Sequence, residues 1–155
     1  MIGISGTRTA ALVAAGALLF VAMPAHAQLV DTPQNLAKTW ADAYATKTGE
    51  PMTRVYARDA LLWGSQSKDP TIGIDAIKQH YDRTGQIVAE RSATISKMQT
   101  NQRKRVTMVV GTMELKAKLK DGAVRNNQAR FSMTIIRESR RQWAIVSHHI
   151  SLMPQ

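Results

Sequence analysis

The chain has 155 residues and a formal net charge of +10, with 21 Lys and Arg residues against 11 Asp and Glu residues. This length suits one ordinary domain, and a sequence without cysteine excludes disulfides, thiolate catalysis and thiolate metal sites. The basic excess favours an anionic partner, because net charge governs non-specific association more than it governs fold.

The first 27 residues are typical of a secretory signal peptide. Arg8 precedes a run of small apolar residues at positions 10–23, and Ala25-His26-Ala27 forms a cleavage site of the A-x-A kind. A retained membrane anchor is the alternative, but a spanning helix needs ~20 apolar residues and this run is shorter. We therefore predict cleavage near Ala27, a mature periplasmic or secreted domain of residues 28–155, and no stable membrane insertion.

Three helices are predicted in the first half of the mature chain. Asp31-Thr32-Pro33 combines a capping side chain with a proline suited to a first helical turn, and apolar residues then recur at helical spacing through Ala45. A short second helix is expected from Pro51 to Tyr56, followed by a buried strand at residues 60–63. A third helix is predicted from Gly73 to Thr84, with Gly85 as its stop.

The second half has the pattern of long strands joined by polar turns. Residues rich in β-branched side chains predict strands at 87–100, 105–119, 123–138 and 142–152. The Asp121-Gly122 pair is the clearest hairpin signal. This order of elements predicts an α+β domain in which three helices cover one face of a curved, mostly antiparallel sheet.

Two parts of the sequence resemble a known superfamily. The stretch from Tyr56 to Gly64, followed by Gly73 to Ile77, resembles the nuclear transport factor 2-like (SnoaL-like) superfamily. Ala129 to Ser132 and the last strand, Trp143 to Pro154, are similar to its bacterial branch related to the association domain of calcium/calmodulin-dependent protein kinase II. The resemblance implies a cone-shaped fold with a pocket between helices and sheet. It also implies a homodimer, or a ring of dimers, formed through the outer sheet face.

Arg130 is the first candidate for ligand binding. In a strand, side chains alternate between faces, so Arg130 shares a polar face with Gln128 and Ser132. Because it lies in mid-strand, we expect its guanidinium to point into an enclosed space and to bind an anion. A structural ion pair with Glu114 or Asp42 is the alternative.

The last strand carries two adjacent histidines that alternation places on opposite faces. His148 and His149 therefore do not form one metal site, and no metal is expected. By the resemblance, His149 is the one that faces the pocket. The resemblance also implies that Arg125 lines the cavity, although its place near a turn fits a solvated side chain equally well.

Two aromatic residues complete the predicted site. Trp63 and Tyr81 are expected to frame the ligand as an aromatic wall and a hydroxyl donor, with an ordinary core position as the alternative for each.

The sequence therefore favours an exported, dimeric domain that binds a small anionic organic molecule without a cofactor. An isomerase or dehydratase that transfers protons in the same pocket is one alternative, and an oligomeric assembly module is another. Nucleic acid is not expected as a partner, since no aromatic residues interleave with the basic ones to stack on bases.

Overall fold

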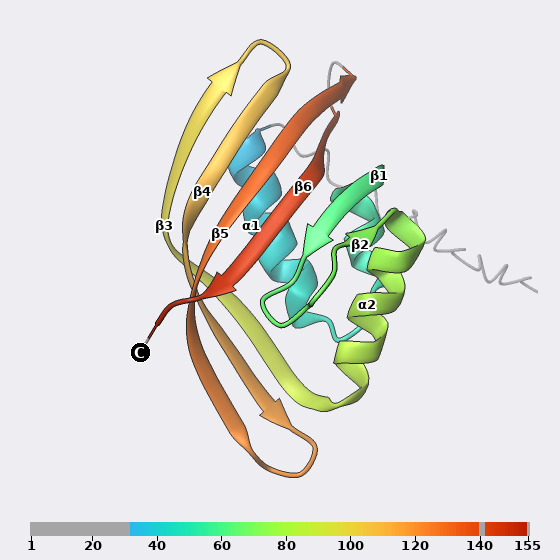
Figure 1. Ribbon diagram of the computed structural model, residues 1–155, viewed down its shortest axis with the longest axis vertical. Helices are drawn as coiled ribbons and strands as arrows, with labels where there is room; N and C mark the ends of the chain where they lie inside the picture. The colour runs from blue at the N-terminus through green and yellow to red at the C-terminus, as the bar shows by residue number, and fades with distance from the viewer. Residues whose placement is uncertain (1–31, 140–141, 155) are drawn as a thin grey trace, which may run out of the picture.

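The computed structural model describes residues 32–139 and 142–154, so the predicted signal peptide lies outside the described residues. Two α-helices and one 3-10 helix pack against a six-stranded sheet (Figure 1). The elements, in chain order, are α1 (Pro33–Ala45), η1 (Glu50–Arg54), β1 (Tyr56–Trp63), β2 (Thr71–Ile72), α2 (Ile74–Gln86), β3 (Val88–Arg103), β4 (Val106–Leu119), β5 (Val124–Ser139) and β6 (Gln142–Leu152).

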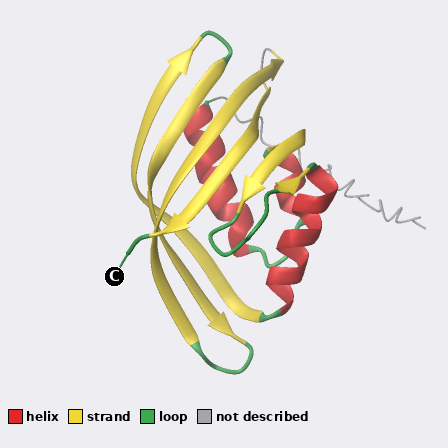
Figure 2. Ribbon diagram, in the orientation of Figure 1, coloured by secondary structure: helices red, strands yellow, loops and turns green. Residues whose placement is uncertain are grey.

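The sheet has the order β2-β1-β6-β5-β4-β3, and only the contact between β1 and β6 is parallel. The three hairpins of β3 to β6 follow from polar turns between long β-branched runs. Figure 2 shows that the helices lie on one side of this strongly bent sheet. The expected α+β class and the mostly antiparallel curved sheet are confirmed.

The expected number of α-helices is wrong, since the described residues hold two. The segment predicted as the second helix forms the 3-10 helix η1, in which Pro51 occupies the first turn. Pro51 supplies no backbone N–H, and a segment of five residues is too short to sustain α-helical hydrogen bonding. The short strand β2 was also not predicted, because two residues carry no periodic pattern.

Helix α1 begins as its sequence predicts and supplies much of the core. The Thr32 hydroxyl accepts a hydrogen bond from the Asn35 N–H at 3.1 Å, and Pro33 follows in the first turn. Leu36 and Trp40 are fully buried against the sheet. At roughly 1.5–3 kcal/mol for each large buried apolar side chain, this face anchors α1 to the sheet.

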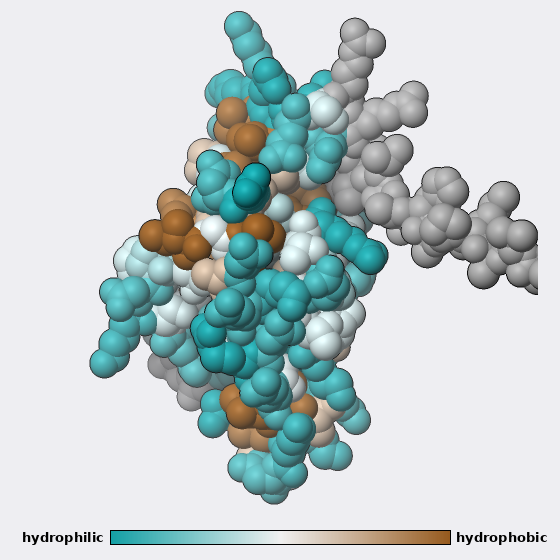
Figure 3. Space-filling model, turned by 90° about the vertical axis from the view of Figure 1, so that its right-hand side faces the viewer, coloured by the Kyte–Doolittle hydropathy of each residue, from teal (hydrophilic) through white to brown (hydrophobic). Residues whose placement is uncertain are grey.

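The side of the molecule that carries α2 presents mainly polar side chains. The described residues visible in Figure 3 are mostly hydrophilic, with hydrophobic groups in small separate patches. Within the described part of the chain, neither α-helix has the length and apolar character that crossing a membrane requires.

Candidate functional site

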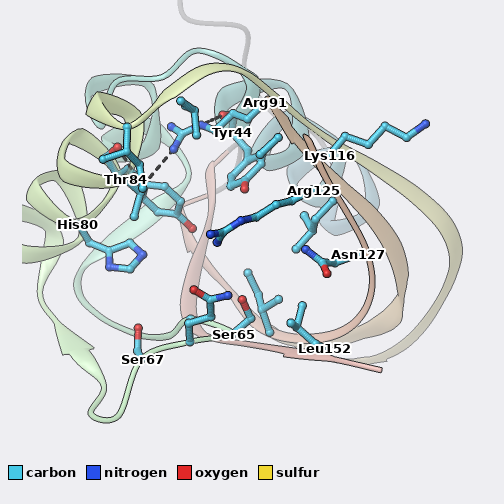
Figure 4. Close-up of a pocket in the computed structure, with 18 of the residues that line it drawn as sticks. Tyr44, Ser65, Ser67, His80, Thr84, Arg91, Lys116, Arg125, Asn127 and Leu152 are labelled. Carbon is cyan, nitrogen blue, oxygen red and sulfur yellow. Dashed lines mark hydrogen bonds between the residues drawn. The ribbon is translucent and has the colours of Figure 1, made fainter. Parts of the chain in front are cut away.

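A cavity of about 350 Å³ lies between α2 and the part of the sheet formed by the start of β3, the end of β4 and the start of β5. Figure 4 shows its walls: α2 on one side, β3 to β5 curving around the other, and the loop after β1 below. Among the described residues, the charged side chains in the cavity wall that are not directed away from it are basic, namely Arg91 and Arg125. Lys116 is also part of the wall, but its side chain points away from the cavity (Figure 4) and pairs with Glu114 at 3.0 Å. The remaining wall is largely apolar, with Leu115, Leu119 and Leu152 among its members.

Arg91 of β3 is the most unusual residue of this wall, because it is an arginine that is only 6 % exposed. Its Nε donates to the carbonyl oxygen of Tyr44, and its Nη1 donates to the hydroxyl of Thr84 at 3.0 Å. Its Nη2 is buried without a hydrogen-bond partner among the described residues. The guanidinium also lies over the rings of Tyr44 and Tyr81, at 4.7 and 5.8 Å from their centroids.

No described carboxylate pairs with Arg91. Asp82 is the acidic group whose charge acts on it, and burial nevertheless lowers the pKa of Arg91. The carboxylate of Asp82 is already engaged, since it accepts from the Gly49 N–H at 2.7 Å and pairs with Lys78 at 3.0 Å. Arg91 is therefore a buried cation that forms no ion pair with any described carboxylate, which is a costly arrangement.

Two of the residues predicted from the sequence lie in the wall of the cavity. Arg125 of β5 reaches toward its centre (Figure 4). Tyr81 of α2 is buried in the wall, where its hydroxyl accepts from the Trp40 indole N–H at 3.2 Å. Burial raises the pKa of Tyr81 to about 12, so its hydroxyl stays protonated at neutral pH.

A line of buried hydrogen bonds leads from Tyr81 into the core. Its hydroxyl lies 3.3 Å from that of Tyr56, which in turn lies 2.7 Å from Nδ1 of His148. His148 is 1 % exposed, and burial lowers its pKa to about 3. These groups are therefore neutral at neutral pH, and they hold Tyr81 in a fixed orientation beside the cavity.

The expected positions of Arg130 and His149 inside the cone are wrong. Both side chains are exposed on the outer face of the sheet, where they line a separate hollow of about 590 Å³. Arg130 donates to the Ser151 hydroxyl at 3.1 Å, and Glu114 pairs with Lys116 instead. A mid-strand position did not enclose Arg130, because one face of this antiparallel sheet has no described layer over it.

A β-bulge explains which histidine faces the helices. In the pairing of β5 with β6, Thr134 faces Ser147 and Ile135 faces Ile145, so Val146 is an extra residue. The extra residue lets Ile145 and His148 point to the same face although they are three positions apart. His148 thus takes the inner position that was predicted for His149.

Trp63 also lies away from the cavity. It pairs with His149 at the parallel contact of β1 and β6, and its side chain is 46 % exposed. Its indole N–H donates to the carbonyl oxygen of Ser67 at 3.1 Å. Trp63 therefore supports the loop at 64–67, which forms one wall of the cavity, rather than contacting the cavity itself.

Two cavity residues were missed by the sequence analysis, Arg91 and His80. Arg91 lies on the same inner face of β3 as Ala93 and Ile95, two and four positions before them. A charged residue in this otherwise apolar row was the sequence feature that could have identified it. His80 lies three positions after the buried Ile77, at the edge of the apolar face of α2. In the described ranges, no three His, Asp or Glu side chains gather closely enough to hold a metal ion.

Comparison with known proteins identifies the domain. The SnoaL-like domain profile matches residues 34–155. No curated protein matches the chain in sequence.

Solved structures share the fold. One is a Xanthomonas campestris protein named for the calcium/calmodulin-dependent protein kinase II association domain, with 21 % identity, a TM-score of 0.70, and coverage of 79 % of this chain and 86 % of that one. A nuclear transport factor 2-like superfamily protein from Salmonella enterica has 13 % identity, a TM-score of 0.71, and coverage of 77 % and 87 %. A ketosteroid isomerase-like protein from Erwinia carotovora has 14 % identity, a TM-score of 0.69, and coverage of 83 % and 99 %. At these identities the likeness establishes the fold and no activity.

Proposed function

The chain belongs to the SnoaL-like domain family, with a nuclear transport factor 2-like fold, and from this premise we propose that its cavity binds one small organic anion. The observation that carries the proposal is Arg91, a buried guanidinium without a carboxylate partner among the described residues. A ligand carboxylate in the cavity would supply the missing negative charge beside Arg91, while the exposed Arg125 can give that carboxylate charge-assisted hydrogen bonds, which are among the strongest in proteins.

The anion has a second cationic contact in Arg125. Arg91 is held in the wall by its hydrogen bonds to Tyr44 and Thr84, so its charge acts on the cavity from a fixed position. Arg125 is exposed, and its guanidinium reaches toward the centre of the cavity (Figure 4). It can therefore contact a bound ligand without a change of side-chain conformation. Asn127 beside it offers an amide for a further hydrogen bond.

The rest of the wall fits the body of the ligand. Leu115, Leu119 and Leu152 give one apolar side, and Tyr44 and Tyr81 give an aromatic one. A cavity of about 350 Å³ is at the small end of the range for ligand sites, which is roughly 300–1,000 Å³. The ligand class is therefore a carboxylate with a compact apolar or aromatic body.

Calorimetric titration with 4-phenylbutanoate, and with its uncharged amide as the matched probe, tests the proposal. We expect the carboxylate to bind at least about tenfold more tightly than the amide, which corresponds to one charge-assisted contact. Arg91→Met and Arg125→Gln should each remove this preference. Arg130→Gln is the control on the outer face and should leave binding unchanged.

Two other results would contradict this proposal. If Arg130→Gln or His149→Gln abolishes binding while Arg91→Met does not, the anion binds in the outer hollow, and the two residues that the sequence analysis predicted as ligand contacts bind it there rather than inside the cone. If the carboxylate and the amide bind equally, the anion proposal fails.

Two further features of the proposal concern where the protein acts and in what form. Residues 1–27 have the composition of a signal peptide, so we propose export with cleavage after Ala27. Mass spectrometry of the protein recovered from the periplasm should then give a chain that begins at Gln28, whereas an intact N-terminus would contradict export.

The second feature is dimerisation through the outer sheet face, where Val106, Met108 and Val110 expose apolar side chains.

A further inference from the structure

His80 gives the same cavity a group that can accept a proton. Its ring lies in the cavity wall and packs edge-on against Tyr81, with 5.2 Å between ring centroids. In Figure 4 the His80 ring and the Arg125 guanidinium point toward one common space, while the Arg91 guanidinium lies in the wall and is hydrogen-bonded to Tyr44 and Thr84. The backbone of Gly64 on the other side is so close that a Cβ there would lie 3.6 Å from Nε2 of His80.

His80 has no structural hydrogen bond to explain its position. Within the described ranges, neither of its ring nitrogens has a hydrogen-bond partner, in contrast to His148, which lies 2.7 Å from the Tyr56 hydroxyl. Its side chain is only partly buried, so one ring nitrogen is open to whatever occupies the cavity. A histidine of this kind can exchange protons with a ligand.

The surroundings of His80 keep the ring uncharged. Burial lowers its pKa first, and the positive charges of Arg83 and Arg91 lower it further. No described carboxylate lines the cavity to hold a proton on the ring. At neutral pH the imidazole is therefore free to take up a proton, which is the state that a general base requires.

We propose that His80 is a general base that removes a proton from the carbon next to the carbonyl of a bound 2-oxo carboxylate. The inference rests on the proposed function, because Arg91 and Arg125 must hold the carboxylate and place that carbon near the ring. The C–H bond breaks, its proton passes to a ring nitrogen of His80, and its electron pair forms the C=C bond of an enolate. The negative charge moves to the former carbonyl oxygen.

The two arginines also suit the second half of this step. An enolate carries one more negative charge than the bound keto acid, and Arg91 supplies a buried positive charge held in a fixed position in the cavity wall. Return of the proton from His80 to the same carbon restores the keto acid, and return to a different carbon of a conjugated substrate isomerises it. Both outcomes conserve all atoms and electrons without an oxidant or reductant.

Hydrogen exchange on 2-oxo-4-phenylbutanoate tests this inference. The purified protein is incubated with the keto acid in D₂O, and ¹H NMR follows the loss of the methylene signal at C3 above the uncatalysed background. We expect His80→Gln to lower the exchange rate at saturating keto acid by about 10²-fold or more while the dissociation constant changes little. His149→Gln is the matched control and should exchange like the unmodified protein.

The outcomes separate this inference from the proposed function. Binding of the keto acid with equal exchange in the unmodified protein and in His80→Gln would overturn the role of His80 and leave anion binding intact. Binding of the keto acid without hydrogen exchange in the unmodified protein would also overturn the role of His80 and leave anion binding intact. Failure of the unmodified protein to bind the keto acid at all would overturn both. Circular dichroism of His80→Gln confirms that a loss of exchange is not a loss of fold.

Discussion

Arg91 is a charged side chain at a position that packing alone would give to an apolar residue. Its neighbours on the inner face of β3, Ala93 and Ile95, pack against the core, and its own guanidinium is buried over Tyr44. Residues kept for a ligand are often unfavourable for stability in the empty protein. The stability of an Arg91 variant is therefore informative in addition to its binding.

Arg91→Met should raise the free energy of unfolding of the ligand-free protein by about 1 kcal/mol, because a buried unpaired charge is replaced by an apolar chain of similar length. Urea denaturation without ligand measures this change. Lys116→Met, at a more exposed basic position of the same wall, should change stability by less than about 0.5 kcal/mol. A loss of more than 2 kcal/mol in Arg91→Met would instead show that its hydrogen bonds to Tyr44 and Thr84 are structural.

His148 should make the folded state sensitive to acid. Burial lowers its pKa to about 3, whereas the same group in the unfolded chain titrates near its ordinary value of 6.5. Between these values the unfolded chain binds a proton that the folded chain does not bind, so stability falls as the pH falls from 6.5 toward 3. The steepest slope for one such group is about 1.4 kcal/mol per pH unit.

Urea denaturation at a series of pH values measures that slope. His148→Gln removes the titrating ring and should flatten the dependence, although the lost packing lowers stability at every pH. The charge of the adjacent His149 is the smaller cause of the lowered pKa of His148, after burial, so His149→Gln should keep most of the slope of the unmodified protein. An equal loss of slope in both variants would assign the effect to the pair rather than to burial.

At the scale of elements, Gly85 shows how two segments distant in sequence meet. The sequence analysis interprets Gly85 as a helix stop, yet α2 continues to Gln86. A Cβ at Gly85 would lie only 1.7 Å from the carbonyl oxygen of Lys47, in the segment that follows α1. The glycine is therefore needed for the close approach of two backbones that fixes α2 beside α1.

Gly85→Ala should destabilise the fold by about 2–3 kcal/mol, the cost of inserting a methyl group where backbone must move. Gln79→Ala, at an exposed position of the same helix, is the control and should change stability by less than about 0.5 kcal/mol. Urea denaturation of the two variants measures the difference. Near-equal stability would mean that the Lys47 segment shifts freely and does not position α2.

The elements with a strong period were predictable and the local irregularities were not. The apolar residues of α1 indicate the right element and the right buried face. In β5 the strand itself was predicted, but the polar row with Arg130 was expected to face the helices, and the apolar row of Ala129, Phe131 and Met133 faces them instead. The bulge at Val146 has no such pattern, and it reverses which residues of β6 face the helices. Arg125 and Tyr81 lie in the cavity wall, and Tyr81 is also a buried core residue, the alternative that the sequence left open for it. Arg130 was misplaced because alternation gives two faces without naming the covered one.

At the scale of the whole molecule, the sheet separates two basic hollows. The inner cavity has Arg91 and Arg125 in its wall, while the outer hollow has Lys97, Arg130 and His149. Helices cover only the inner face (Figure 2), so among the described residues the outer face is the part of the sheet left open. The exposed apolar side chains of β4 cross this open face, and this arrangement favours contact with a second copy.

Met108→Glu should weaken the proposed dimer by at least about tenfold. A two-fold contact places the same patch of each copy against the other, so one substitution introduces two negative charges into an apolar contact. Met108 is 51 % exposed and lies on β4 between Val106 and Val110. Val124→Glu, at a 74 % exposed position near the other end of the sheet, is the matched control.

Light scattering after size-exclusion chromatography, over a range of protein concentrations, measures the mass of each variant. The unmodified protein and Val124→Glu should keep the mass of a dimer at concentrations where Met108→Glu has the mass of one chain. A ring of dimers would appear as a higher mass that Met108→Glu also lowers. The mass of one chain in the unmodified protein at every concentration would contradict dimerisation, and it would leave the outer hollow, with Arg130 and His149, open to solvent.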